Sequence, residues 1–460
     1  MNIEKFKVRG NKVKFTLGSQ DFTVKYPEKY NFTREYHNLL KEIPLCMWAN
    51  SLAFTKPKET SVPFEVPEYT EKFWLWIAQK VHEFDCYESG TQPEKIRPTI
   101  ETQSEQRGLL QTPSLSQDGY AGAIISQSTG KESVASKIIL DNMGIENESV
   151  FIEYPSRALT HKQDGKAEFD NYFGKSTRVW TNCNCLQSTL HEHTDNYIPV
   201  TIFWEMLYSV IELPMAAYDK FKYIIMGNEI SAGERKEGKN YVTWEDFQQS
   251  AIYELALTSY IKCQHNLPIV HTSVVGPITS FGCRKVVLEN EPEFYPKVQS
   301  CLRPTPDNRW CLKCYKCERA WIENVALGVN PEDVGLSNSC LIENPHLGAD
   351  TDDWGYSTSK YDRDEYIWNE YVDLTEDNSI ACQLTINESN HLKIWRKRQK
   401  ERVESYDEYG KYVDKWSSPA ERHLPSELVP DSIEGIDGKT DYIPDSYDVD
   451  GRRALEWIDV

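Results

Sequence analysis

The sequence has no apolar run that approaches the ~20 residues needed to cross a bilayer. Its first residues, Met1 to Lys5, lack the basic and then apolar order of a secretory signal peptide. We therefore expect a cytoplasmic protein that has no membrane partner. In a reducing compartment the 12 cysteines are expected to be free thiols, so clustered cysteines indicate a metal site rather than disulfides.

An excess of basic residues is also absent, because 51 Lys and Arg stand against 71 Asp and Glu, a net charge of −20. Residues 331–460 hold 30 acidic and 14 basic side chains, which is −16 of that total. The first 330 residues carry the remaining −4. Such a chain repels a phosphate backbone, so bulk nucleic-acid binding is not expected.

The length of 460 residues allows about two to three domains. Alternating apolar residues on either side of residues 7–11 predict a β-hairpin or small meander, within a β-rich or mixed N-terminal extension over 1–117. A polar stretch at 103–119 is typical of a linker. We expect a sheet domain over 118–330, and then an acidic region over 331–460 with a basic amphipathic helix at 392–406.

The pattern of the middle region predicts a parallel α/β sheet. An apolar run at 121–125 leads into a polar loop at 126–130, and a helix with one apolar face then runs to Gly144, which should end it. A second apolar run follows at 150–154, which completes a strand–loop–helix–strand unit. Further strands are expected near Val179, at 223–226 and at 274–275, and further helices from about 198 and over 247–257.

The polar loop reads Ser128-Thr129-Gly130-Lys131-Glu132-Ser133. A small-residue loop that opens a helix directs backbone N–H donors and the positive end of the helix dipole at one point, as ATP phosphates require. Lys131 would neutralise phosphate charge, and the hydroxyls of Ser126, Ser128 and Ser133 would add hydrogen bonds. The four-residue gap of a Walker loop is missing. An ordinary helix N-cap would also explain these residues.

The second motif is a set of four cysteines with the spacing Cys-x9-Cys-x2-Cys-x2-Cys: Cys301, Cys311, Cys314 and Cys317. Two-residue gaps let neighbouring thiolates turn onto one tetrahedral ion, and the distant cysteine supplies the fourth ligand. We predict a structural Zn²⁺ site, because four protein ligands leave no position open for a substrate. The nearby Lys313, Lys316 and Arg319 are expected to offset the charge of the thiolates.

A weaker cluster combines Cys183 and Cys185 with His191 and His193. These residues would suit a metal or a catalytic group. A polar loop with ordinary thiols is the favoured interpretation.

The loop resembles the Ser-Gly-Gly-x-Asp-Ser loop of the N-type ATP pyrophosphatases, with Thr129 in place of the first glycine and Glu132 in place of the aspartate. Together with four cysteines about 170 residues later, it resembles the 7-cyano-7-deazaguanine synthase family over roughly residues 118–325. The resemblance implies a parallel-sheet domain of the adenine nucleotide alpha hydrolase-like (PP-loop) type that carries a small zinc module at 301–317. The N- and C-terminal regions would be additions to it.

The resemblance also implies a reaction. ATP would place its phosphates on Ser128 to Ser133, with Lys131, Ser128 and Ser133 as catalytic residues. A small carboxylic acid would attack the α-phosphorus and release pyrophosphate, and ammonia or an amine would then displace AMP. Relatives in anti-phage operons suggest a protein amine, which the acidic region would dock. Mg²⁺ is expected, and its candidate ligands are Glu132, Asp195 and Glu229.

A second resemblance remains open. Gly227-Asn228-Glu229 and Trp310-Cys311-x-x-Cys314 are similar to segments of the ATP-dependent epimerases of UDP-muramoyl-L-alanyl-L-glutamate. This relationship would make Gly227, Asn228 and Glu229 part of the nucleotide site, since they follow a strand.

Two hypotheses without turnover are also open. The first is a degenerate domain that binds nucleotide and does not react with it. The second is a nucleic-acid-binding zinc ribbon, against which the net charge of −20 stands.

Overall fold

The computed structural model describes residues 1–102, 115–154, 159–186, 190, 204–229, 235–237, 241–244, 246–276, 280–301, 308–312 and 314–337. The predictions for His191, His193, Asp195, Lys313 and the region beyond residue 337 lie outside the described residues. This includes the basic helix expected at 392–406. Among the residues described, no helix has the length and apolar character to cross a membrane.

The protein is built around one mixed sheet of eight strands, in the order β1-β2-β3-β8-β7-β6-β9-β12. Five neighbouring strands, from β8 to β12, are parallel, and the N-terminal meander adds three antiparallel strands at the β8 edge. The sheet strands are β1 (Ile3–Arg9), β2 (Lys12–Leu17), β3 (Gln20–Lys25), β6 (Ala123–Ser126), β7 (Asn147–Glu153), β8 (Thr177–Thr181), β9 (Tyr223–Ile225) and β12 (Val270–Thr272).

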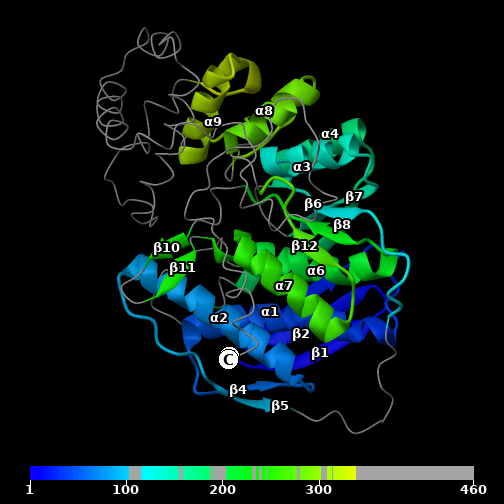
Figure 1. The fold of residues 1–460 in the computed structure, drawn as a ribbon, viewed down its shortest axis with the longest axis vertical. Helices are drawn as coiled ribbons and strands as arrows, with labels where there is room; N and C mark the ends of the chain where they lie inside the picture. The colour runs from blue at the N-terminus through cyan, green and yellow to red at the C-terminus, as the bar shows by residue number, and fades with distance from the viewer. Residues whose placement is uncertain are drawn as a thin grey trace.

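Helices cover both faces of this sheet (Figure 1). One face carries α3 (Lys131–Asn142), α4 (Leu159–Phe173), α8 (Ser280–Asn290) and α9 (Tyr315–Ala326). The other carries α1 (His37–Thr55), α2 (Glu68–Ser89), α6 (Trp204–Asp219) and α7 (Ala251–His265). Two short pairs complete the described elements: parallel β4 (Glu59–Val62) with β5 (Thr99–Thr102), and antiparallel β10 (Arg235–Glu237) with β11 (Val242–Trp244).

The strand residues alternate between two cores, as the period of a β-strand requires. In β6, Ile124 packs into the core beneath α1, α6 and α7, whereas Ala123 and Ile125 pack into the core beneath α3 and α8. Because both faces are covered, β6 is apolar at each of these positions. The expected α/β class and the parallel sheet are thus confirmed, and Gly144, with φ +68°, follows the end of α3 as predicted.

The N-terminal meander is part of the same sheet, since Val24 and Lys25 of β3 pair with Thr181 and Trp180 of β8. Its helix α1 packs against α6. The domain boundary at residue 117 remains a prediction. One strand prediction is wrong: the last strand covers Val270–Thr272, and residues 274–275 lie in the turn that follows it.

Chain order across the parallel strands places a topological switch point in the middle of the sheet. From β6 the chain moves outward to β7 and β8 by way of α3 and α4, and it then returns to β9 on the other side of β6. Ligands of open α/β sheets bind beyond the carboxyl ends of the strands at such a point. Here that position lies between the segments after β6 and after β9.

Candidate functional site

The switch point brings together the two loops that the sequence singled out. The segment 127–130 follows β6 and leads into α3, and the segment 226–229 follows β9. A Cβ atom added to Gly227 would lie 3.0 Å from Cβ of Glu132 and 3.2 Å from the backbone nitrogen of Ser133. A side chain at residue 227 would force the first turn of α3 to shift, so glycine allows the β9 loop to lie directly against it.

Thr129 holds a backbone conformation that favours glycine. Its φ is +63°, in the left-handed region, although it is β-branched and therefore incurs a steric penalty there. This is the position where the resembling loop carries its first glycine. The chain thus keeps the glycine-like turn without the glycine, and such strained backbone is concentrated at functional sites.

The donors of the loop converge on one atom that belongs to the protein itself. Oε1 of Gln127 accepts hydrogen bonds from the backbone N–H of Ser128 (3.0 Å) and of Thr129 (2.9 Å), and from the hydroxyl of Ser133. Two backbone donors fix the assignment of this oxygen, because an NH₂ group cannot accept them. A side-chain oxygen of the protein thus accepts hydrogen bonds from the donors at the head of the helix, where the positive end of the helix dipole favours negative charge.

The two serine hydroxyls complete this local network. The N–H of Gly130 donates to Oγ of Ser128 at 3.2 Å, and Oγ of Ser128 lies 3.2 Å from Oγ of Ser133. Thr129, Lys131 and Ser133 are all buried. In this state the loop is closed and internally satisfied.

Lys131, the first residue of α3, forms an ion pair with the neighbouring Glu132. Burial opposes ionisation of Glu132, but the Lys131 ammonium outweighs it and holds the pKa of this carboxyl below its usual value, with help from Lys316. The cation that the sequence assigned to phosphate is therefore present at the head of the helix. It is already held by a carboxylate.

The β9 segment is fixed by buried hydrogen bonds. Asn228 donates from Nδ2 to Oε1 of Glu254 at 3.1 Å, and its carbonyl accepts from the hydroxyl of Ser273 at 2.9 Å. Burial raises the pKa of Glu254 to about 7, although the hydrogen bond from the Asn228 side chain opposes the rise. Asn228 is thus held by the segments next to it. Glu229 lies 4.0 Å from the guanidinium of Arg319 on α9.

Two acidic residues of α6, Glu205 and Glu212, interact with residues of the loop region. No sequence motif predicts this. Burial and the charge of Asp246 raise the pKa of Glu205 well above its usual range, and Glu132 adds to this effect. Its Oε2 is buried without a hydrogen-bond partner among the described residues. Burial raises the pKa of Glu212 to about 8, although Ser126 opposes the shift. Both lie in an apolar helix 70 or more residues from the loop, so no local spacing connects them with it.

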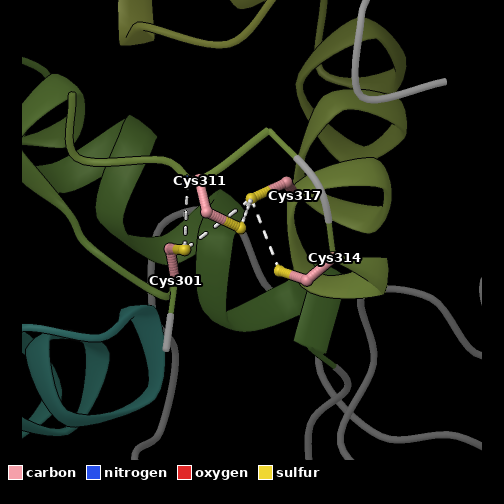
Figure 2. Close-up of side chains that lie close together, drawn as sticks. All are labelled: Cys301, Cys311, Cys314 and Cys317. Atoms are coloured by element: carbon pink, nitrogen blue, oxygen red, sulfur yellow. Dashed lines mark hydrogen bonds between the residues drawn. The ribbon is translucent and has the colours of Figure 1, made fainter. Parts of the chain in front are cut away.

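The four cysteines meet as the spacing predicted. Their sulfur atoms all lie within 4.8 Å of one another and point toward a common centre (Figure 2). The Sγ atom of Cys317 lies 3.5 Å from that of Cys314, 3.7 Å from that of Cys311 and 3.8 Å from that of Cys301. Tetrahedral Zn²⁺ with bonds of about 2.3 Å requires sulfur separations of ~3.8 Å, so the arrangement fits a metal ion such as zinc.

The backbone around the cluster has the form of a tight metal-binding turn. The N–H of Cys311 donates to Sγ of Cys301 at 3.3 Å, and that of Cys317 donates to the carbonyl of Cys314 at 2.9 Å. Leu312, between two ligands, is left-handed with φ +59°. Cys301 and Cys317 are buried in the same core as α3 and α8, so the cluster is anchored on the body of the protein.

The weaker cluster is only half described, because Cys183 and Cys185 are placed and His191 and His193 lie outside the described residues. The two cysteines lie in a short 3-10 turn after β8, and burial raises the pKa of the Cys183 thiol to about 12. A neutral, buried thiol is a poor nucleophile. Among the described residues, the only group of three or more metal-ligating side chains that converge is the four-cysteine cluster.

Fold and site together define a three-layer α/β protein with a closed helix-head loop at its switch point and a four-cysteine cluster beside it. No protein-family model matches the chain, and no curated protein matches it. The family resemblance therefore stays a prediction based on the motifs.

Proposed function

We propose that this protein uses ATP to adenylate the carboxylate of a small acid and releases pyrophosphate. The observation that carries the proposal is the loop before α3: at the switch point, Thr129 is left-handed and Lys131 begins the helix. Oriented amides and the helix dipole favour an anion there. The contact of Gly227 with the first turn of α3 adds the second predicted segment to the same place.

In this proposal the triphosphate takes the position of the Gln127 carbonyl. The N–H groups of Ser128 and Thr129 and the hydroxyl of Ser133 then donate to phosphate oxygens instead of to Oε1 of Gln127. Lys131 turns from Glu132 to the charge that grows on the leaving pyrophosphate. Because the amides are already oriented, the exchange replaces one acceptor with another and little reorganisation is needed.

The acid substrate attacks the α-phosphorus in line with the leaving pyrophosphate. The chain's contribution to this step is positioning and charge neutralisation. Glu132 and Glu205 are suited to hold Mg²⁺, since both carboxylates lie near the loop and Glu205 has a buried oxygen without a partner among the described residues. Mg²⁺ would neutralise phosphate charge.

The chemistry at the site is compatible with two acids. A deazaguanine acid that is passed on to ammonia or an amine would extend the synthase resemblance. A muramoyl-dipeptide glutamate whose α-carbon is inverted would extend the epimerase resemblance. Consumption of one acid with ATP, from a panel that contains both, decides between them.

The closed loop favours a second candidate, a protein that binds nucleotide without turnover. Oε1 of Gln127 competes with phosphate for three donors, and Thr129 adds bulk where the resembling loop has none. Such a protein would bind ATP and form no AMP. The same assay therefore separates the two candidates.

The test is ATP–pyrophosphate exchange in the presence of the acid panel. The wild-type protein should exchange label into ATP with at least one acid, and Lys131→Ala should lower the rate by about 100-fold or more, since a preorganised charge contact is lost. The matched control is Lys137→Ala, on the same helix but paired with Asp141. Absence of exchange with every acid, or equal rates for Lys131→Ala and Lys137→Ala, would refute adenylation.

A further inference from the structure

The four-cysteine cluster is physically connected to the helix-head loop. Two residues before Cys301, the N–H of Gln299 donates to the carbonyl of Thr129 at 2.9 Å. Two residues after Cys317, Arg319 lies 4.0 Å from Glu229 of the β9 segment. We call the described residues 299–301, 308–312 and 314–319 the cysteine module, and through Gln299 and Arg319 this module contacts both loops of the switch point.

Arg319 is held in place by a buried carboxylate. Its Nε donates to Oε1 of Glu323 at 3.1 Å, and its side chain is 12% exposed. Glu323 also accepts from Arg284 at 2.7 Å and from the hydroxyl of Ser280 at 2.7 Å. The charges of Arg284 and Arg319 overcome burial and lower the pKa of Glu323 to about 2, so it remains an anion. This arrangement fixes a guanidinium beside the β9 segment.

The sequence predicts that Lys316 and Arg319 offset the charge of the thiolates. That role stays a prediction. In the structure Arg319 pairs with Glu323 and lies 4.0 Å from Glu229 of the β9 segment. The charge of Lys316 also helps to lower the pKa of Glu132 and opposes the rise in the pKa of Glu205. The cysteines, which fix the start of α9, determine where Lys316 and Arg319 lie.

Gln299 provides an independent sign that a ligand completes the site. Its side chain is 5% exposed, and both Oε1 and Nε2 lack a hydrogen-bond partner among the described residues. The amide lies against Thr129, where the missing side chain of Gly165 leaves room: a Cβ atom at Gly165 would be 3.3 Å from Oε1 of Gln299 and 3.5 Å from Oγ1 of Thr129. A buried unpaired amide is costly, which is reasonable only if a bound group pairs with it.

We propose that the cysteine module forms one wall of the anion site, with Arg319 and the amide of Gln299 as binding groups for the pyrophosphate part of the ligand. This inference rests on the proposed function and extends it. The four-cysteine cluster then has a role beyond the stability of its own turn, because it positions Arg319 and Gln299 beside the loop.

The experiment measures binding of inorganic pyrophosphate, without Mg²⁺, to the full-length zinc-loaded protein by calorimetry. Arg319→Gln should weaken binding by about 10- to 100-fold, the loss expected for one charged hydrogen bond, and Arg319→Lys should restore part of it. Arg309→Gln is the matched control, because Arg309 is two residues from Cys311 but pairs with Glu168 on α4. It should bind as the wild type does.

Gln299→Met separates a ligand contact from a structural role. Methionine has a similar shape and removes the unpaired amide, so the melting temperature of the ligand-free protein should be unchanged or higher while pyrophosphate binding weakens. Glu229→Gln removes an anion that competes for Arg319, and binding should become tighter. If Arg319 had only a structural role, Glu229→Gln would not increase the affinity for pyrophosphate.

The outcomes distinguish this inference from the function on which it rests. If Lys131→Ala loses pyrophosphate binding while Arg319→Gln and Gln299→Met bind normally, the module is not part of the site and the proposed function survives. If the wild-type protein binds neither pyrophosphate nor ATP, both proposals are wrong. If Gln299→Met binds pyrophosphate more weakly but Arg319→Gln binds it as the wild type does, Arg319 is not a binding group.

Discussion

The loop at the head of α3 and the cysteine cluster before α9 each bring several polar groups to one point, but they differ in what those groups contact. In the loop, Oε1 of Gln127 satisfies three donors, so the ligand-free state is complete. In the cluster, four sulfur atoms lie within 4.8 Å of one another, an arrangement that could hold a metal ion such as zinc. The loop thus satisfies its own donors, whereas the cluster has the spacing of four ligands around a metal.

The largest effect is expected at the cluster. Cys314→Ser removes one of four ligands, and it should reduce bound zinc well below one ion per chain and lower the free energy of unfolding by several kcal/mol, since structural zinc binding contributes directly to folding. Metal analysis and thermal unfolding measure both quantities. Cys263→Ser, which changes an exposed thiol on α7, is the control. Full zinc content in Cys314→Ser would show that the four cysteines do not bind the ion, and the contrast between loop and cluster would fail.

A pH-dependent effect of intermediate size is expected beneath the loop, at Glu212. Its pKa is about 8 in the folded protein against an ordinary 4.5, so its contribution to stability is full below pH ~4.5 and is lost as the pH rises toward 8. Glu212→Gln removes this loss. Its stability relative to the wild type should therefore rise between pH 6 and pH 8, by up to a few kcal/mol.

Thermal or urea unfolding at pH 6 and pH 8 measures this difference. The exposed Glu289→Gln on α8 controls for the change in net charge. A gain that is the same at both pH values would show that Glu212 does not ionise with a raised pKa.

The smallest effect is expected for Gln127→Ala, and it has two parts of opposite sign. Without an anion, three donors lose their acceptor, so the free energy of unfolding should fall by roughly 1–3 kcal/mol. With pyrophosphate present, the competing oxygen is gone, and affinity should rise by about tenfold. Melting curves with and without pyrophosphate measure both parts, and Gln20→Ala, which changes a partly exposed amide, is the control. Weaker pyrophosphate binding by Gln127→Ala would contradict the exchange of acceptors.

The sequence predicts those parts of the molecule that depend on local spacing. The apolar period of Val134, Ile138 and Ile139 identified α3, and the two-residue gaps between cysteines identified the cluster. In both, neighbouring residues in the chain are also neighbours in space. The strand after α7 shows the limit of this approach: Val274 and Val275 are apolar and buried, but the hydrogen-bonded pairing ends at Thr272.

The rest depends on contacts between distant segments. Besides burial, the charge of Glu132 raises the pKa of Glu205, which lies on α6 more than 70 residues away in the chain. Gln299 donates to the loop from the start of the cysteine module, more than 160 residues away. Gln127 belongs to the loop itself, but its role follows from the rotamer that brings Oε1 under the amides. Neither residue type nor spacing specifies such a fit.

The most direct test of the central claim is a crystal structure of the zinc-loaded protein with α,β-methylene-ATP, which resists cleavage at the α-phosphorus. Phosphate oxygens should replace Oε1 of Gln127 on the N–H groups of Ser128 and Thr129, and Lys131 should contact the β- or γ-phosphate. A nucleotide bound elsewhere, with the Gln127 hydrogen bonds intact, would contradict the proposed exchange of acceptors and with it the assignment of the loop to ATP.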